Sequence, residues 1–342
     1  MIFVTGGTGL IGSHILYALV TKGEKVKALK RKSSNLENVV KTFSYYCENP
    51  EERFAEIDWL DGDILDYFEL EKLLSGVEQV YHCAAIVSFN PADRDKIIRN
   101  NVEGTANMVN AAIENSVQKF CHVSSVAALG SASDGSWVNE ETDWAAAKKI
   151  TGYAESKFYS ETEIWRGIEE GLDAVIVNPS IVLGPGNWDS GSSQLFKRIW
   201  KGMKFYTKGI TGFVDVRDLV NAMILLMNDD NFKICKNQRY ILNADNLSYK
   251  SVFFKIADSL DRPRPKYYAS KCLLNVAWRA SLLFKLITGT KPLITREIAT
   301  SSNSVKKIDG SKISRILNFE YLPVFSSIEQ TCAILKKEMQ KL

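Results

Sequence analysis

The segment that most constrains the fold lies at residues 4–14 and reads VTGGTGLIGSH, directly after the apolar run MIFVT. Its glycines Gly6, Gly9 and Gly12 recur at three-residue spacing. In a strand–turn–helix unit, the first such glycine permits a tight turn, the second lets backbone approach a pyrophosphate, and the third lets the helix pack on the strand. The segment therefore predicts a dinucleotide-binding turn that follows the first strand of a parallel sheet.

The apolar runs that follow repeat the same alternation. KVKALK, EQVYHCAA, QKFCHVSS and DAVIVNPS are each separated by a segment of helix length. Alternating strands and helices predict an α/β fold with a doubly wound parallel sheet. We expect FVDVRDLVNAMILLM and RYILN to return to this sheet, so that the first domain spans 1–180 plus 213–243. Residues 181–212 plus 244–342 are expected to form a smaller, mostly helical C-terminal substrate lobe.

The composition of the 342 residues is that of an ordinary globular protein, with a formal charge of only +3. We find no basic run interleaved with aromatic residues, which argues against nucleic acid as a partner. The glycine-rich start leaves no room for the apolar core of a signal peptide, so we expect a cytoplasmic protein. Six scattered cysteines and three histidines show no metal-ligand spacing, so no metal site is predicted.

The second predicted strand ends in KALKRKSSN, where Lys30, Arg31 and Lys32 stand without an acidic residue. An acid at this position would hydrogen-bond the ribose hydroxyls of NAD, whereas a basic cluster would neutralise the extra phosphate of NADP. The cluster therefore predicts NADP(H) rather than NAD(H). The alternative is a solvated positive turn with no ligand.

The segment TGYAESKF places Tyr153 four residues before Lys157 in a pattern typical of a helix. Residues at this spacing lie on one face of a helix, so the phenol and the ammonium can act at one point. By itself the pair does not require chemistry, because tyrosine and lysine are common on helix surfaces.

The segment CLLNVAWRASLLFKLITG, residues 272–289, is strongly apolar but contains Arg279 and Lys285. Because a membrane-spanning helix needs about twenty apolar residues, we predict a buried or substrate-facing helix and no integral membrane segment. A contact with a membrane surface stays open.

Several motifs occur together in the order of one family. The chain resembles the extended short-chain dehydrogenases/reductases of the NAD-dependent epimerase/dehydratase superfamily over essentially its full length. The motifs that carry the resemblance are TGGTGLIG, GDILD, VYHCAA, NNVEGTANMVNAA, HVSSVAALG, YAESK, VNPSIVLGPG and FVDVRDL. The resemblance implies a Rossmann fold and a homodimer paired through the helices near 91–116 and after Tyr153.

Within that family, EETDWAAAKKITGYAESKFYSETEIW and LDAVIVNPSIVLGPG resemble the dihydroflavonol reductase, cinnamoyl-CoA reductase and aldehyde reductase branch. Epimerases of the family usually carry a tyrosine where this chain has Leu129, and dehydratases an acid pair where it has Val126 and Ala127. The resemblance thus implies NADP(H)-dependent reduction of a small-molecule aldehyde or ketone. A nucleotide-sugar epimerase is the alternative, and a coenzyme-binding regulator without catalysis is a third reading. Trp278, Leu283 and Phe284 favour a hydrophobic substrate.

The resemblance also implies site residues. Tyr153 would be the general acid, Ser125 would hydrogen-bond the carbonyl oxygen, and the Lys157 ammonium would favour the Tyr153 phenolate. Ser124 is the alternative hydroxyl, and His82 and His122 are more simply core residues. The residues implied to bind coenzyme are Gly6, Gly7, Thr8, Gly9, Leu10, Ile11 and Gly12 at the pyrophosphate, Lys30, Arg31 and Lys32 at the second phosphate, Asp63 and Ile64 at the adenine, Ala84 and Ala85 along the ribose path, and Ser124, Tyr153, Lys157, Pro179 and Val182 towards the nicotinamide.

Overall fold

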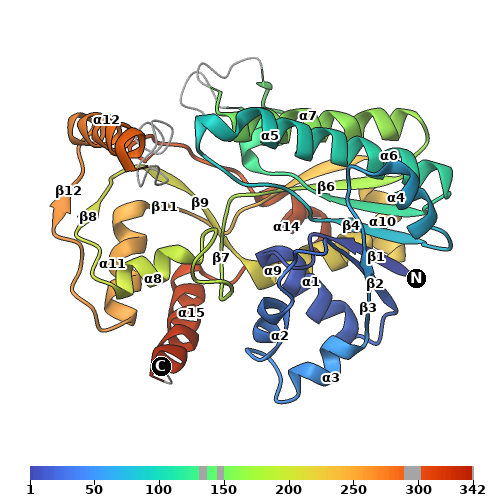
Figure 1. The fold of residues 1–342 in the computed structure, drawn as a ribbon, viewed down its shortest axis with the longest axis horizontal. Coiled ribbons are helices and arrows are strands. Elements are labelled where there is room, and N and C mark those ends of the chain that lie inside the picture. The colour runs from blue at the N-terminus through green and yellow to red at the C-terminus, as the bar shows by residue number, and fades with distance from the viewer. Residues whose placement is uncertain (131–136, 145–149, 289–301, 341–342) are drawn as a thin grey trace.

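The computed structural model describes residues 1–130, 137–144, 150–288 and 302–340, without the side chains of 282–288. Its largest element is a seven-stranded sheet in which all neighbouring strands are parallel (Figure 1). The strands, in spatial order, are β10 (Gln238–Leu242), β6 (Ala174–Pro179), β5 (Lys119–Val123), β4 (Gln79–His82), β1 (Ile2–Thr5), β2 (Val26–Lys30) and β3 (Ile57–Asp61). The order reverses between β1 and β4, as in a doubly wound sheet, so the predicted fold class is confirmed.

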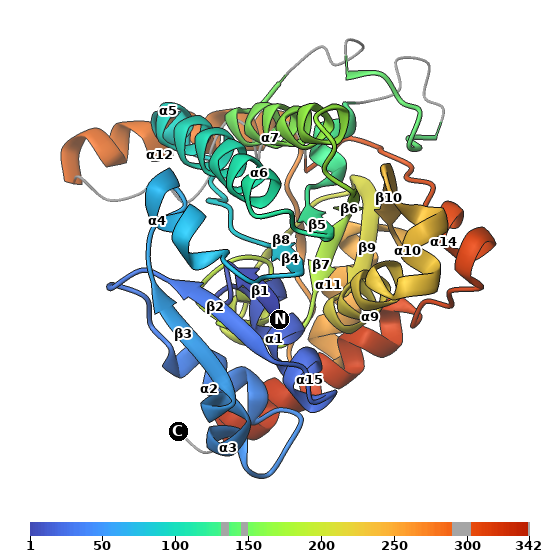
Figure 2. The same ribbon diagram turned by 90° about the vertical axis from the view of Figure 1, so that its right-hand side faces the viewer.

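Helices cover both faces of this sheet, and Figure 2 shows the two layers on opposite sides. One layer packs on the core that contains Ile2, Val4 and Val175. Its helices are α1 (Leu10–Thr21), α2 (Glu37–Phe43), α3 (Pro50–Ala55), α9 (Val216–Met227), α10 (Asp229–Cys235) and α14 (Ser311–Leu317).

The second layer packs on the core that contains Phe3, Phe120 and Ile176. Its elements are α4 (Tyr67–Leu73), α5 (Arg94–Ile98), a π-helical segment (Arg99–Glu103), α6 (Gly104–Glu114) and α7 (Gly152–Glu169). Two short 3₁₀ segments, Pro91–Asp93 and Val126–Leu129, lie in the connections. Because both faces are covered, the central strands are mostly apolar, and every residue of β5 and β6 is buried.

The smaller lobe has its own core around Phe196, Phe213 and Ile256. Its helices are α8 (Gln194–Trp200), α11 (Tyr249–Ser259), α12 (Lys271–Thr288) and α15 (Val324–Met339). Its strands are β7 (Ile181–Leu183), β9 (Ile210–Asp215) and β11 (Asp245–Ser248) in one sheet, and β8 (Phe205–Tyr206) and β12 (Tyr267–Tyr268) in another. The sequence had indicated helical and irregular structure for 181–212 and 244–342, so these two small sheets were not predicted. Residues 213–215, which were expected to return to the main domain, pair in β9 with β7 and β11 instead.

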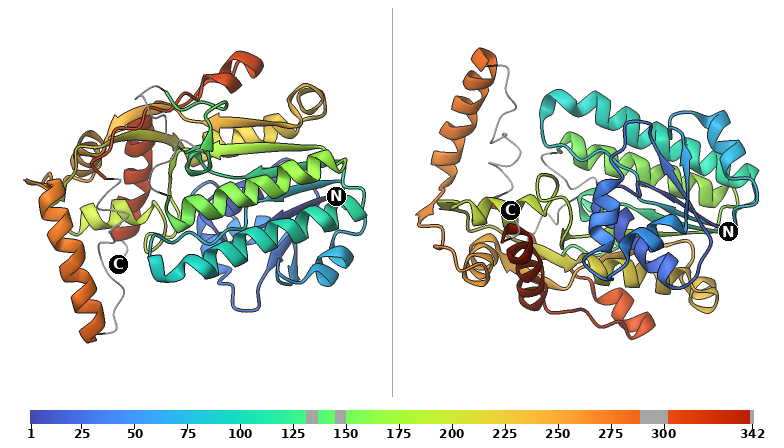
Figure 3. Two further views of the ribbon diagram at one scale, coloured as in Figure 1. Left: turned by 90° about the horizontal axis from the view of Figure 1, so that it is seen from above. Right: turned by 60° about the horizontal axis from the view of Figure 1, so that its bottom comes forward.

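Helix α12 corresponds to the apolar segment at 272–289, and in both views of Figure 3 it stands apart from the rest of the chain. In its described first part Leu274 is buried, whereas Leu273 and Val276 are exposed. Burial, one of the two expectations for this helix, is therefore wrong for this part, because little of the described lobe packs against it; a substrate-facing role stays a prediction. Leu283 and Phe284 lie outside the described side chains. Among the described residues, no helix combines the length and apolarity that crossing a bilayer requires.

Candidate active site

A groove of about 210 Å³ lies at the carboxyl ends of β1, β2 and β4, where the strand order reverses. This is the place where open parallel sheets bind their ligands. Among the predicted coenzyme residues, those that line the groove are Gly6, Thr8, Gly9, Lys30, Arg31, Asp63, Ile64, Ala84 and Ala85. Leu29, Ser34, Gly62, Cys83, Ile86 and Asn100 line it as well, although the sequence analysis did not single them out.

The glycine-rich turn has the shape that a pyrophosphate needs. Gly6 has φ +70°, and a Cβ on it would lie 2.6 Å from the Ala84 amide nitrogen. The Gly9 amide donates to the Gly6 carbonyl at 3.0 Å, and Gly9 caps α1, whose first amides have no partner within the helix. Free amides and the positive end of the helix dipole attract phosphate, so the turn fits a dinucleotide. The backbone of Leu10, Ile11 and Gly12 supplies these amides.

We expect Gly12→Ala to lower the free energy of unfolding by about 2–3 kcal/mol or more, because overpacking a closed site is costly. A Cβ at Gly12 would lie 2.0 Å from the Gly6 carbonyl oxygen, and backbone cannot move aside as a side chain can. Urea unfolding measures the change. Gly152→Ala is the control, since its Cβ would meet the movable Arg94 side chain at 3.0 Å. Equal stability of the two variants would contradict the account.

The three basic residues after β2, Lys30, Arg31 and Lys32, have different surroundings. The Lys30 ammonium forms an ion pair with Asp61 at the end of β3, so part of its charge is already neutralised. Arg31 is exposed and lines the groove, and Ser34 accepts a hydrogen bond from the Arg31 amide at 3.1 Å. Lys32 is exposed but is not among the lining residues. Within the described chain neither Arg31 nor Lys32 forms an ion pair, which leaves Arg31 available to an anionic ligand.

Thr151 caps the N-terminus of helix α7 and so defines where the helix begins. The Thr151 hydroxyl accepts a hydrogen bond from the Ala154 amide at 3.0 Å, and Glu155 lies in the first turn. Arg94 of α5 holds this turn by donating to both oxygens of Glu155, at 3.0 and 2.6 Å. Tyr153 is the second residue of α7, so it belongs to a helix terminus that is tied to a neighbouring helix.

The Tyr153 phenol lies close enough to the Ser125 side chain for Ser125 to act on its pKa. Burial raises the pKa of the Tyr153 phenol above its ordinary value, and the Ser125 side chain acts in the opposite direction. The expectation that the Lys157 ammonium favours the phenolate finds no support here, because burial dominates and Lys157 is not among the groups that shift this pKa. The neutral phenol is therefore the favoured form.

Lys157 lies one turn further along α7, and its side chain is buried. Its ammonium donates to the carbonyl of Val123, the last residue of β5, at 2.8 Å. Burial lowers the pKa of Lys157 to about 8, while Cys83 and Glu161 oppose the shift. The structure thus gathers Ser125, Tyr153 and Lys157 at the carboxyl end of β5.

Ser124 points away from this group. Its hydroxyl donates to the buried Glu161 carboxylate at 2.6 Å, and that carboxylate also accepts from Asn178 at 2.7 Å and from Arg239 at 3.1 Å. Asn178 in turn donates to the Ser125 carbonyl at 3.2 Å. The predicted coenzyme contact of Ser124 is therefore not supported, because its hydroxyl is engaged in a buried network that braces the backbone of Ser125.

Asn101 is a buried residue that the sequence analysis did not assign, although it lies inside the motif NNVEGTANMVNAA. It sits in the π-helical segment, a distortion that is frequent at functional sites. Its side chain binds the Ile86 backbone at both the amide (2.7 Å) and the carbonyl (3.0 Å), and donates to Ser156 at 3.1 Å. It thereby joins the loop that lines the groove to the helix of Tyr153 and Lys157.

The other predicted residues lie around this site. Gly7 faces Leu16 of α1, which a Cβ would meet at 2.7 Å, so it serves packing. Pro179 ends β6 and is buried, and Val182 of β7 packs partly against the core of the main sheet. His82 is buried and bonded to Thr5 (2.7 Å) and Thr105 (3.1 Å). His122 is also buried and stacks on His82, so both are core residues in this structure.

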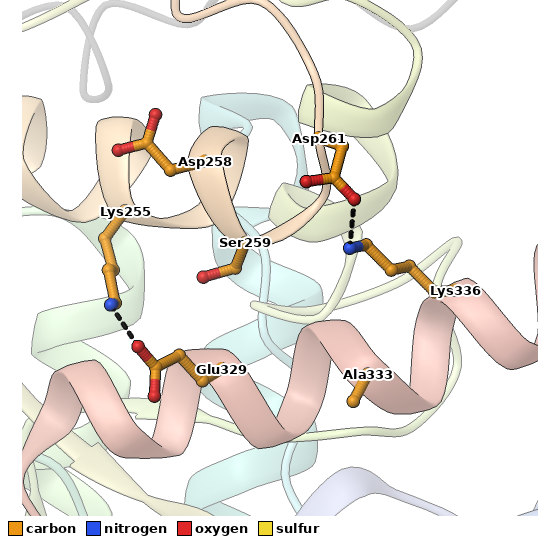
Figure 4. A pocket seen from close by; sticks show the side chains of 7 residues that line it. All are labelled: Lys255, Asp258, Ser259, Asp261, Glu329, Ala333 and Lys336. Carbon is orange, nitrogen blue, oxygen red and sulfur yellow. Dashed lines mark hydrogen bonds and ion pairs between the residues drawn. The ribbon is translucent and has the colours of Figure 1, made fainter.

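A second hollow, of about 390 Å³, lies between α11 and α15 in the smaller lobe (Figure 4). Its ion pairs are Lys255 with Glu329 and Lys336 with Asp261. Because these charges satisfy one another and no predicted site residue lines it, it does not compete as the active site. The described residues also contain no group of three or more His, Cys, Asp or Glu that could hold a metal ion.

Comparison with known proteins adds to this geometry. Residues 2–238 match the model of the NAD dependent epimerase/dehydratase family. A relative from Synechocystis named "Putative dihydroflavonol 4-reductase" is 30% identical over 336 residues, covering 97% of this chain and 92% of its own. Cinnamoyl-CoA reductase 1 of Petunia hybrida is 28% identical and covers 66% of this chain and 68% of its own.

Among solved structures, the UDP-glucose 4-epimerase of Thermotoga maritima superposes with a TM-score of 0.77 at 19% identity, covering 99% of both chains. At this identity the likeness supports the fold alone. The named reductases support an NAD(P)-dependent oxidoreductase. The sheet, the glycine-rich turn and these matches lead to one conclusion: the chain is an enzyme that belongs to the NAD dependent epimerase/dehydratase family.

Proposed function

We propose that the chain is an NADP(H)-dependent reductase of an aldehyde or ketone, with Tyr153 as its general acid. The observation that carries the proposal is the gathering of Ser125, Tyr153 and the buried Lys157 ammonium at the carboxyl end of β5, next to a groove that fits a dinucleotide. The turn after β2 contains Arg31 and no acidic residue. This supports NADP(H) over NAD(H), because a guanidinium pairs well with the additional phosphate of NADP(H).

When bound, the reduced nicotinamide would supply a hydride to the carbonyl carbon. Tyr153 would give its phenolic proton to the carbonyl oxygen as negative charge develops there. The raised pKa of Tyr153 suits this role, because it keeps the phenol protonated at neutral pH. An alkoxide is a stronger base than a phenolate, so the transfer is still favourable.

Ser125 and Lys157 would support this transfer. The Ser125 hydroxyl stands beside the phenol and would donate to the same carbonyl oxygen, holding it in line. Lys157, one turn along the same helix, would bind the nicotinamide ribose. Its pKa of about 8 leaves the amine mostly protonated at neutral pH.

The nucleotide-sugar epimerase is less well supported. Leu129 occupies the position of the epimerase tyrosine and is fully buried against Val138, Ile241 and Ile308. It therefore cannot present a polar group to a sugar. Val126 and Ala127, which follow Ser125 directly, offer no acid or base either. We propose that the smaller lobe, which comprises residues 181–212 and 244–342 apart from α14, supplies the substrate pocket, for a hydrophobic carbonyl compound.

The coenzyme content of the purified protein tests this choice. A reductase consumes one coenzyme for each product and must release it, whereas an epimerase regenerates its coenzyme and can keep it bound. We expect protein denatured after purification to release little nicotinamide coenzyme, as measured by enzymatic cycling. One equivalent of NAD per chain would contradict the proposal.

We also propose a homodimer paired through α5–α6 and α7, and predict a dimer mass by light scattering at micromolar concentration. Tyr159 on α7 is 45% exposed, an aromatic side chain that a partner helix could cover. Tyr159→Arg should shift the mass towards the monomer. A monomer mass for the unaltered chain would contradict this prediction.

A further inference from the structure

Two stretches that are distant in the sequence lie side by side at the far end of the smaller lobe. Strand β12 pairs in parallel with β8, with Tyr267 opposite Phe205 and Tyr268 opposite Tyr206 (Figure 1). The amides of Lys266 and Tyr267 both donate to the Lys204 carbonyl at 3.0 Å. Helix α12 begins three residues after β12, so its first turns belong to the same end of the molecule.

These stretches carry a strong local excess of positive charge. Residues 197–208 and residues 262–281 each contain five Lys or Arg residues and no Asp or Glu. Lys197 pairs with Asp189, and Arg264 pairs with Asp258. The other basic side chains of these two stretches form no ion pair with any residue that the structure describes. The whole chain carries only +3, so this charge is concentrated at one end.

Apolar side chains are exposed among these charges. Phe205, Tyr267 and Tyr268 are 48%, 58% and 40% exposed, and Lys208 lies 4.6 Å from the centre of the Tyr268 ring. On α12, Leu273 (43%) and Val276 (60%) are one helical turn apart and face solvent together. Residues 262–271, RPRPKYYASK, thus place four basic side chains beside two tyrosines, contrary to the expectation that the chain has no such run.

We propose that this basic-aromatic surface, made of residues 204–208, 262–268 and 271–276, binds the surface of an anionic lipid bilayer. Unpaired Lys and Arg side chains are attracted to anionic headgroups. Exposed Tyr and Phe rings suit the interface between headgroups and acyl chains, and Leu273 and Val276 would enter the apolar boundary. The chain would lie on the membrane, since none of its described helices could cross one.

Nucleic acid also attracts basic and aromatic side chains, but it has no apolar interior that would accept Leu273 and Val276. Leu273 and Val276 are exposed together on one helix face, beside aromatic rings and unpaired cations. This combination fits a bilayer surface, with its charged headgroups above an apolar interior, better than it fits nucleic acid. This favours lipid as the occupant.

Co-sedimentation of the full chain with vesicles tests the proposal. We expect binding to vesicles of phosphatidylcholine mixed with phosphatidylglycerol, little binding to phosphatidylcholine alone, and a loss of binding at high salt. Lys204→Glu combined with Lys266→Glu should lower the partition coefficient by at least about thirtyfold. Each lost cation weakens binding to an anionic surface by about five- to sixfold, and the two factors multiply. Leu273→Ser combined with Val276→Ser should weaken binding by about tenfold or more.

Matched controls use similar residues elsewhere on the chain. Lys25→Glu with Lys72→Glu makes the same change of charge at exposed sites, and Phe68→Ser removes a ring that is 72% exposed on α4. Thermal unfolding checks that all variants fold. The proposal is wrong if the unaltered chain ignores lipid charge, if the control lysines matter as much as Lys204 and Lys266, or if an oligonucleotide binds this surface while vesicles do not.

Discussion

Tyr153→Phe should lower the turnover of carbonyl substrates by at least about 100-fold while NADPH binding changes little. The substitution removes one hydroxyl and keeps the ring that packs edge-on against Phe89, with ring centres 5.5 Å apart. The Ser125 hydroxyl would remain to hydrogen-bond the substrate, but no phenolic proton would be available to the developing alkoxide. Steady-state rates and coenzyme titration measure the two effects separately.

Tyr159→Phe is the matched control, because it removes the same hydroxyl from the same helix at an exposed position. It should retain nearly all activity. Near wild-type turnover of purified Tyr153→Phe would overturn the catalytic assignment. A large loss of NADPH affinity in that variant would instead assign Tyr153 mainly to coenzyme binding.

Arg31→Asp should weaken NADPH binding relative to NADH by about 1.5–3 kcal/mol, the scale of a charge-assisted contact with a phosphate. Arg31 lines the groove and forms no ion pair with a described residue, whereas Lys30 is already paired with Asp61. The new carboxylate would repel the second phosphate of NADPH, and it could accept hydrogen bonds from the ribose hydroxyls of NADH. Titration of coenzyme fluorescence reports both affinities.

Lys32→Asp separates a specific contact from the general positive charge of the turn. Lys32 has the same charge as Arg31 but does not line the groove, so its replacement should change the preference much less. If the unaltered chain binds NADH as tightly as NADPH, the turn is merely solvated and the coenzyme assignment fails.

Much of the main sheet could be predicted from sequence. Five apolar runs correspond to β1, β2, β4, β5 and β6, and the expected returning strand RYILN corresponds to β10. Strands buried on both faces are rich in apolar residues, which makes them visible in the sequence. Strand β3, with the sequence IDWLD, was not among them. It lies at the edge of the sheet, and its exposed Asp58 and Asp61 interrupt the apolar pattern.

The smaller lobe was harder to predict. Strands β8 and β12 have two residues each and owe their pairing to contacts between segments about sixty residues apart, which no local pattern reveals. The apolar composition of α12 suggested burial. Hydrophobicity alone, however, does not say whether a neighbouring element is present to cover a helix.

At the site, residue identities were easier to predict than environments. The motifs indicated Ser125, Tyr153 and Lys157, and the structure brings them together at the end of β5. The sequence could not show that Asp61 engages Lys30, that Glu161 holds Ser124, or that burial raises the Tyr153 pKa. Each of these depends on a residue far away in the chain or on the surrounding packing.

The most direct test of the reductase assignment is the fate of a labelled hydride. NADPH carrying deuterium at the transferable position should be oxidised in equal amount to the alcohol formed from an aldehyde or ketone, and the deuterium should appear on the product carbon. Loss of nicotinamide absorbance and mass spectrometry of the product give the two quantities. Interconversion of nucleotide sugars with no net change in nicotinamide absorbance, and no oxidation of NADPH by any carbonyl compound, would contradict the account.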